Sequence, residues 1–283
     1  MRKTTALAIC LAVLMTVPLA AQLTLPRPSP NAKIAQTVGL TDITITYSRP
    51  GVKDRTIWGE LVPYDKVWRT GANEATIVSF ADDVTVNGNK LAAGSYSLHT
   101  IPGKEEWTLI FNSAADPKAN YSYDESKDVL RVKVKPETTG HMHERMMFVI
   151  PNVTDTSADI ALEWEKVKVP FKVEVDTMTK LQAAAKTEIA SASADAWRVP
   201  YQAANWAYTN KLAWPELDQW LEQSLKARET YSNLVLKARL LADKGKKADA
   251  IATAEKAIKI AKEGSATANV SQAENLIKEW KGK

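Results

Sequence analysis

Cysteine is almost absent from this sequence, because Cys10 is the only one in 283 residues. A single cysteine cannot form an intramolecular disulfide, so a hydrophobic core must hold the fold together. Cys10 also does not fit a lipoprotein signal, since Ile9 precedes it where a small residue would be expected. The composition therefore excludes a small disulfide-stapled scaffold and favours a chain with a sizeable core.

Long apolar runs are missing after the N-terminus, and we expect no transmembrane segment in the mature chain. The N-terminal run, residues 4–15, is too short to span a bilayer. It follows the basic Arg2 and Lys3 and precedes the small residues Ala20 and Ala21. That order is typical of a secretory signal peptide. We expect residues 1–21 to be removed and the mature protein, which then has no cysteine, to be periplasmic or secreted.

A strong charge of one sign is also lacking. The formal net charge is +4, and it falls to +2 when Arg2 and Lys3 leave with the signal peptide. The chain has no long basic stripe, which argues against a nucleic-acid partner.

Familiar catalytic motifs are absent as well. There is no GxSxG elbow, no phosphate-binding P-loop and no GxGxxG fingerprint. Carboxylate pairs such as Asp82–Asp83 fit solvated turns or strand faces. We predict no catalytic residue and a non-catalytic binding role, with a hydrolase of envelope glycans or peptides as the alternative.

What is present divides the chain into two halves of different period. Between residues 40 and 175 apolar residues recur at every second position, as in Ile43, Ile45 and Tyr47, which is typical of half-buried strands. Asn87-Gly88 is a hairpin signal. About nine such short segments predict an antiparallel, jelly-roll-like β-sandwich over residues 22–175.

After Asp176 alanine becomes frequent and the period moves to 3.6, which predicts five or six helices and an α+β chain. Two helical stretches align at an offset of about 33 residues, the tetratricopeptide period. In this alignment Ala207 matches Leu240 and Leu221 matches Ala254. Residues 176–283 are therefore predicted to form a tetratricopeptide-like segment. Its helices either bind a peptide, as a scaffold, or simply cover the sandwich or each other.

Four consecutive segments resemble one bacterial family, catalogued as domain of unknown function 2911. They are SPNAKIAQTVGLTDITITYSRPGVKDR, GELVPYDKVWRTGANEATIVSF, LAAGSYSLHTIPGKEEWTLIFN and YDESKDVLRVKVKP. The resemblance runs from about Ser29 to Val175 in unbroken order. It implies an exported, β-rich protein, often followed by a helical tail, and it implies no activity.

The densest group of binding-type side chains lies in VPYDKVWRTGANEAT, residues 62–76, and in the preceding YSRPGVKDR. Pro63, Asp65 and Gly71 mark a loop there. Guanidinium groups bind carboxylates or phosphates, and indole rings offer flat walls to sugars or aromatic ligands. We predict a site for a small anionic or carbohydrate ligand formed by Arg49, Arg55, Trp68, Arg69, Asn73 and Glu74.

A structural interpretation of the same residues remains open. A long loop must satisfy its own backbone polar groups. Arg69 would then cap carbonyls or pair with Glu74, while Trp68 packs into the core. The loop can serve both purposes.

The three histidines are the remaining candidates. His141 and His143 stand two apart, so on a strand both point to one face. His99 alternates with Ser95 and Ser97 and is expected to face solvent or a shallow sheet surface. We expect no cofactor and three exposed polar side chains. The alternative is a divalent metal held by His99, His141 and His143 with nearby carboxylates.

The signal peptide gives a direct prediction. The full chain, expressed in a bacterium with a C-terminal tag, should yield a mature protein that begins close to Ala21, as read by mass spectrometry of its N-terminal peptide. Leu11→Arg with Leu14→Arg interrupts the apolar run, so that variant should stay uncleaved in the cytoplasm. A native chain recovered with Met1 intact would contradict the prediction.

Overall fold

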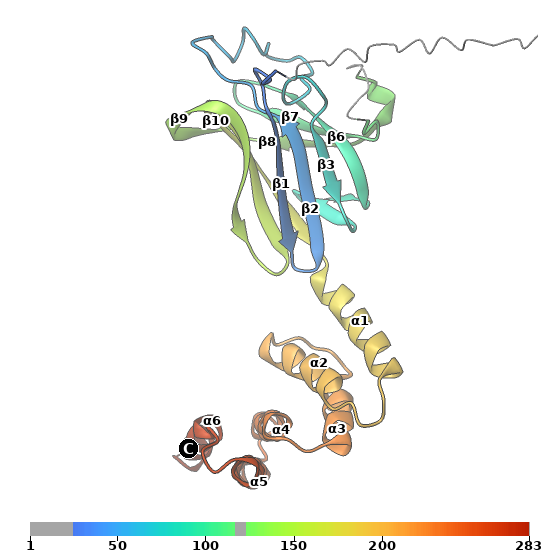
Figure 1. The fold of residues 1–283 in the computed structure, drawn as a ribbon, viewed down its shortest axis with the longest axis vertical. Helices are drawn as coiled ribbons and strands as arrows, with labels where there is room; N and C mark the ends of the chain where they lie inside the picture. The colour runs from blue at the N-terminus through green and yellow to red at the C-terminus, as the bar shows by residue number, and fades with distance from the viewer. Residues whose placement is uncertain (1–24, 117–122, 283) are drawn as a thin grey trace, which may run out of the picture.

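The chain folds into an antiparallel β-sandwich followed by helices, as the computed structural model shows for residues 25–116 and 123–282 (Figure 1). Those residues contain ten strands and six α-helices. The predicted α+β class is therefore confirmed. The predicted signal peptide, residues 1–21, lies outside the described residues.

Two sheets make up the sandwich, and all their pairings are antiparallel. The larger sheet has the order β1 (Asn31–Val38), β2 (Thr41–Ser48), β3 (Ile77–Phe80), β6 (Gly94–Ile101), β7 (Trp107–Asn112) and β8 (Asp128–Val134). The smaller sheet has the order β5 (Asn89–Leu91), β4 (Val84–Val86), β10 (Ser157–Val175) and β9 (Glu137–Val153).

The last hairpin differs from the short strands that the sequence predicts. β9 has 17 residues and β10 has 19. The pairing register shifts between Asp159 and Ala161 and again on both sides of Glu165, whose φ is 57°. Such bulges bend a strand and interrupt its alternation. One long strand therefore looks like two short ones in the sequence.

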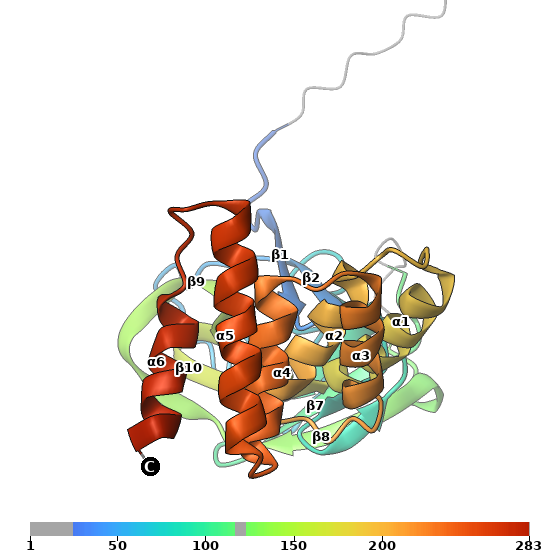
Figure 2. The same ribbon diagram turned by 90° about the horizontal axis from the view of Figure 1, so that it is seen from below.

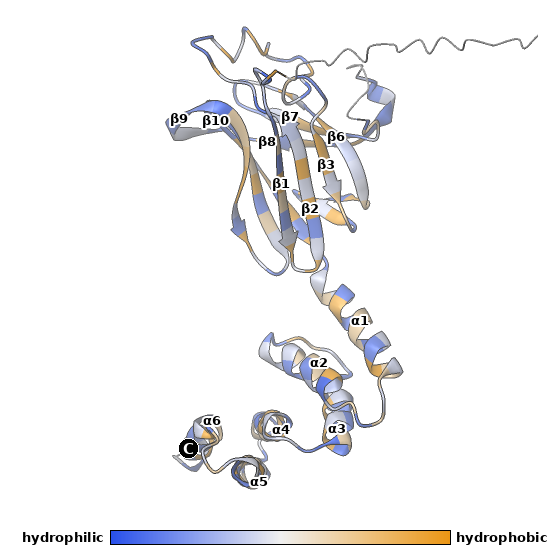
Figure 3. Cartoon of the chain, in the orientation of Figure 1, coloured by the Kyte–Doolittle hydropathy of each residue, from blue (hydrophilic) through white to orange (hydrophobic). Residues whose placement is uncertain are grey.

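The core lies between the two sheets and contains apolar side chains from both. Each strand places alternate residues inward, and Figure 3 shows apolar and polar residues interspersed along the strands. Fully buried members include Ile45, Leu98 and Phe111 from the larger sheet and Trp164 and Val169 from the smaller one. This shared core takes the place of the disulfides that the chain lacks.

The helical segment follows directly after β10. Its helices are α1 (Thr177–Ser191), α2 (Arg198–Thr209), α3 (Leu217–Ala227), α4 (Tyr231–Asp243), α5 (Lys247–Gly264) and α6 (Ser271–Gly282). The six helices agree with the predicted five or six. Within the described residues, no helix combines the length and the apolar character needed to cross a membrane.

The helices pack on one another beyond the end of the sandwich and do not cover it (Figures 1 and 2). α2 and α4 begin 33 residues apart, at Arg198 and Tyr231. Figure 2 shows α4 and α5 side by side, and Ala238 and Ala254 are fully buried where they pack. A buried amide joins α3 to α4, since Asn233 Nδ2 donates to Ser224 Oγ at 3.0 Å.

The joint between sandwich and helices is tightly made. Thr177 Oγ1 donates to the Asp155 carbonyl at 2.5 Å, and Lys180 Nζ donates to the Leu40 carbonyl at 2.9 Å. Lys180 also pairs with Asp82 at 2.5 Å. Gly39 leaves room for this contact, because a Cβ there would collide with Thr177 Oγ1 and the Asp155 carbonyl oxygen.

This close approach predicts unequal costs for two alanine substitutions. Gly39→Ala and Gly88→Ala both force a side chain into positive φ, at 56° and 82°, which costs about 1–2 kcal/mol. Only Gly39→Ala also creates a collision, since nothing lies within 4 Å at Gly88. Urea unfolding should show the Gly39 variant less stable than the Gly88 variant by a further ~1–3 kcal/mol. Equal losses would show that the joint is loose.

Candidate functional site

The long connection between β2 and β3, residues 49–76, is packed onto the sandwich. Val52, Ile57 and Val62 are buried at 2–3% exposure. Trp68 forms a bridge with Thr100 of β6, in which the Trp68 N–H donates to the Thr100 carbonyl at 2.7 Å and the return bond is 2.9 Å. These contacts satisfy part of the backbone of the loop, as the structural interpretation of its sequence requires.

Four tryptophans form a cluster where this loop packs on the sandwich: two belong to the loop and two to the sheets. The ring of Trp58 lies edge-on to Trp68, Trp107 and Trp164, with centroid distances of 5.9, 5.0 and 5.6 Å. Trp68 and Trp164 stack at 5.8 Å with an interplanar angle of 20°. Aromatic pairs in these geometries are worth about 0.5–1.5 kcal/mol beyond the area they bury. The cluster therefore fixes Trp68 and the arginine that follows it.

A cavity of about 380 Å³ opens between the loop and β10. Its polar wall contains Arg55 and Arg69, and its apolar wall contains Trp68, Trp164 and Leu61. Leu61 is 44% exposed at the rim. A pocket of this size, in which polar and apolar walls meet, is large enough for a small ligand.

Arg49, the third arginine of the predicted site, binds a backbone carbonyl and does not line the cavity. Arg49 Nε donates to the Met146 carbonyl at 2.9 Å and joins the loop to β9. Arg55 lines the cavity, but it also donates to the Gly51 carbonyl at 2.6 Å and to the Val52 carbonyl at 3.0 Å. These two bonds close a turn and hold the Arg55 guanidinium in place.

Asn73 and Glu74 bind the segment that precedes β1. Asn73 Nδ2 donates to the Ser29 carbonyl at 3.1 Å. Glu74 forms an ion pair with Arg27 at 2.6 Å, and the hydrogen bond from Arg27 lowers the pKa of this carboxyl group. Of the six predicted site residues, Arg55, Trp68 and Arg69 line the cavity, whereas Arg49, Asn73 and Glu74 lie in contacts of the fold.

The histidine pair lies on β9, in the smaller sheet. The His141 and His143 rings are 4.4 Å apart, so both point to one face, as their spacing predicts. His143 Nε2 lies 3.2 Å from Glu163 Oε2. No three His, Cys, Asp or Glu side chains within residues 25–116 and 123–282 are grouped so that they could hold a metal ion.

His99 is not exposed, contrary to the prediction. It lies on β6 in the larger sheet, apart from the histidine pair, and is only 5% exposed. Ser97 Oγ lies 3.1 Å from His99 Nε2, and the Tyr123 ring covers the imidazole at 5.1 Å between centroids. The sequence alternation placed His99 on the outer face correctly, but it did not show that a distant segment covers that face.

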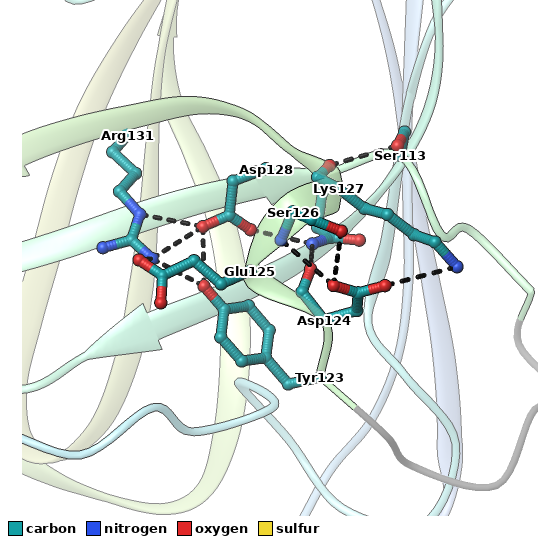
Figure 4. Close-up of polar contacts among 9 residues, drawn as sticks. Ser113, Tyr123, Asp124, Glu125, Ser126, Lys127, Asp128 and Arg131 are labelled. Atoms are coloured by element: carbon teal, nitrogen blue, oxygen red, sulfur yellow. Dashed lines mark hydrogen bonds and ion pairs between the residues drawn. The ribbon is translucent and has the colours of Figure 1, made fainter.

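The covering segment carries a polar network that sequence reasoning missed (Figure 4). Asp128, at the start of β8, accepts hydrogen bonds from Tyr123 Oη at 2.6 Å, Arg131 Nε at 2.8 Å and Asn112 Nδ2 at 2.7 Å. Its side chain is 9% exposed. The one available signal was Asn112, an amide within an apolar strand, since a buried amide must find partners.

The network lowers the pKa of Asp128 and raises the pKa of Tyr123. Burial raises the pKa of Asp128, but the hydrogen bonds from Tyr123, Asn112 and Arg131 outweigh it, so the pKa is lowered overall. Burial and the hydrogen bond to Asp128 raise the pKa of Tyr123 to about 12. Tyr123 therefore stays a donor and Asp128 an acceptor at neutral pH, which keeps the network closed over His99.

Comparison with known proteins gives one match. Residues 29–173 match the model of a family described as "Protein of unknown function (DUF2911)". This stretch is slightly more than half of the chain and ends within β10. No curated protein and no solved structure matches the chain.

The buried imidazole predicts a pH dependence of stability. Burial lowers the pKa of His99 below 6.5, so the unfolded chain takes up the proton more readily than the folded one. His99 therefore contributes its full stability above about pH 6.5, and that contribution declines as the pH falls, by at most ~1.4 kcal/mol per pH unit.

Urea unfolding at pH 7.5 and 5.5 checks this expectation. The unmodified protein should lose more unfolding free energy between the two conditions than the variant His99→Gln. His141→Gln, at an exposed position, serves as the control and should behave like the unmodified protein. An unchanged pH dependence in His99→Gln would contradict the assignment.

Proposed function

The chain belongs to the DUF2911 family of proteins of unknown function, and on that premise we propose that it is an exported, non-catalytic binding module of the cell envelope. Its binding site is the cavity beneath the loop of residues 49–76. Its ligand is a small molecule with an anionic group and an apolar or sugar-like face.

The observation that carries the proposal is the convergence of two cations and two indole rings on one cavity. Arg55, Trp68 and Arg69 of the loop meet Trp164 of β10 around a space of about 380 Å³. The loop residues come from one short segment, but Trp164 is almost a hundred positions away. Only packing of the loop on the smaller sheet assembles the set.

The chemistry of the cavity favours an anion with an apolar body. A guanidinium has five N–H donors, and Arg55 gives two bonds to the Gly51 and Val52 carbonyls. These bonds orient the group while other donors remain for a ligand. Carboxylates and phosphates fit such a fork, and indole walls suit a sugar ring or an aromatic ring.

The residues that line this cavity favour a binding role over glycan hydrolysis. Among the residues that the structure describes, no carboxylate lines this cavity. A glycosidase needs two carboxyl groups facing each other across the scissile bond.

D-glucuronate tests the proposed site, because it combines a carboxylate with a sugar ring. Calorimetric titration of residues 22–283 should show saturable binding, and neutral D-glucose should bind more weakly. Arg69→Ala removes a cation from the wall and Ala72→Trp fills the cavity. Each should weaken binding by at least about tenfold, or ~1.4 kcal/mol.

The control is Arg228→Ala, which removes an exposed arginine at the end of α3. It should leave glucuronate binding unchanged. Near-ultraviolet circular dichroism checks that each variant keeps its tryptophan packing. Absence of binding, or equal affinity in all variants, would exclude this cavity as an anionic-sugar site.

A further inference from the structure

A second cavity lies at the joint between the sandwich and the helices. Its volume is about 340 Å³. It is bounded by the β1–β2 turn at Gly39 and Leu40, by α1 and by α2. Figure 1 shows α1 leaving the end of the sandwich and α2 lying below it. None of its lining residues belongs to the arginine-lined cavity.

The walls of this joint cavity are mostly apolar. Leu181, Val199 and Trp206 supply the larger surfaces, whereas Ala184 and Ala203 leave the space between α1 and α2 unfilled. Leu40 stands at the mouth and is 45% exposed. Exposed apolar surface gathered around a cavity is typical of a site that another molecule covers.

The two charged side chains in the lining of the cavity have no cationic partner among the described residues. Asp155 and Glu188 are the only charged residues in its lining, and both are acidic. Neither carboxylate is paired with a lysine or arginine of the described chain, and the nearby Lys180 is engaged by Asp82 at 2.5 Å. The Trp206 ring lines the cavity and provides apolar surface beside these two carboxylates.

We propose that the joint cavity binds a small apolar molecule that carries a positive charge. The apolar body fills the space over Ala184 and Ala203. The positive charge faces Asp155 and Glu188, and the ring of Trp206 packs against the apolar body.

The cavity is preformed, which favours binding. Thr177 and Lys180 fix the first turns of α1 to the ends of two hairpins of the sandwich through the Asp155 and Leu40 carbonyls. Ala185 and Ile189 of α1 then pack with α2 in one buried cluster. The ligand therefore does not have to order the walls, and a preorganised site loses less entropy on binding.

Tyramine is a suitable probe, because it combines an aromatic ring with an ammonium group. Its matched opposite is 4-hydroxyphenylacetate, in which a carboxylate replaces the ammonium. Both are titrated into residues 22–283 carrying ¹⁵N-labelled tryptophan, and the Trp206 indole signal is assigned with Trp206→Phe. Tyramine should shift this signal saturably, and 4-hydroxyphenylacetate should bind about three- to tenfold more weakly.

Two pairs of variants separate the site from general effects. Ala184→Phe fills the cavity and should abolish tyramine binding, whereas Ala183→Phe places the same ring on an exposed neighbouring position outside the lining and should not. Glu188→Gln should remove most of the preference for tyramine over its anionic analogue. The exposed Glu274→Gln on α6 should leave that preference intact.

The proposal is overturned if tyramine at about 10 mM, ten times a dissociation constant of about 1 mM, leaves the Trp206 signal unchanged. It is equally overturned if Ala184→Phe binds as well as the unmodified protein, or if the anionic analogue binds as tightly as tyramine. Because glucuronate and tyramine address separate cavities, each site can fail without the other.

Discussion

The tryptophan cluster is the contact on which the arginine-lined cavity depends. Trp58 is its centre, since it meets Trp68 of the same loop, Trp107 of the larger sheet and Trp164 of the smaller one. The loop of residues 49–76 is thus held by both sheets at once. Removing the fully buried ring of Trp107 or Trp164 costs about 3–5 kcal/mol. Arg69 follows Trp68 of this cluster directly, and the Arg55 guanidinium is held by the Gly51 and Val52 carbonyls.

The loop of residues 49–76 is attached to the rest of the fold and also borders a cavity. Arg49, Asn73 and Glu74 are used by contacts that join the loop to β9 and to the segment before β1. The loop also contacts β10 through Trp164, and a cavity remains between them. Arg49, Asn73 and Glu74 fit the structural interpretation alone, whereas Arg55 and Trp68 both hold the loop and line the cavity.

The joint between sandwich and helices follows a similar logic. Gly39 has no side chain, so Thr177 approaches the hairpin closely, and Lys180 adds an ion pair with Asp82. The helical segment is attached at a defined place and not by a free linker. Small residues on α1 and α2 then leave an apolar space beside the attachment. Each candidate site is thus a cavity beside a close contact: the tryptophan cluster in the sandwich, and the approach of Thr177 to Gly39 at the joint.

The sequence by itself determined the α+β class, the antiparallel strands, the helical segment and the family, because side-chain periodicity and motif order are local properties. It also pointed to the loop that borders the arginine-lined cavity. It did not determine which of the six proposed site residues line that cavity, since each choice depends on a partner far along the chain, such as Met146 for Arg49 and Arg27 for Glu74. The burial of His99 by Tyr123 and the closure of the network on Asp128 were likewise decided only by tertiary packing. An alternating pattern tells which face of a sheet a residue occupies, but only the folded chain decides what comes to lie against that face.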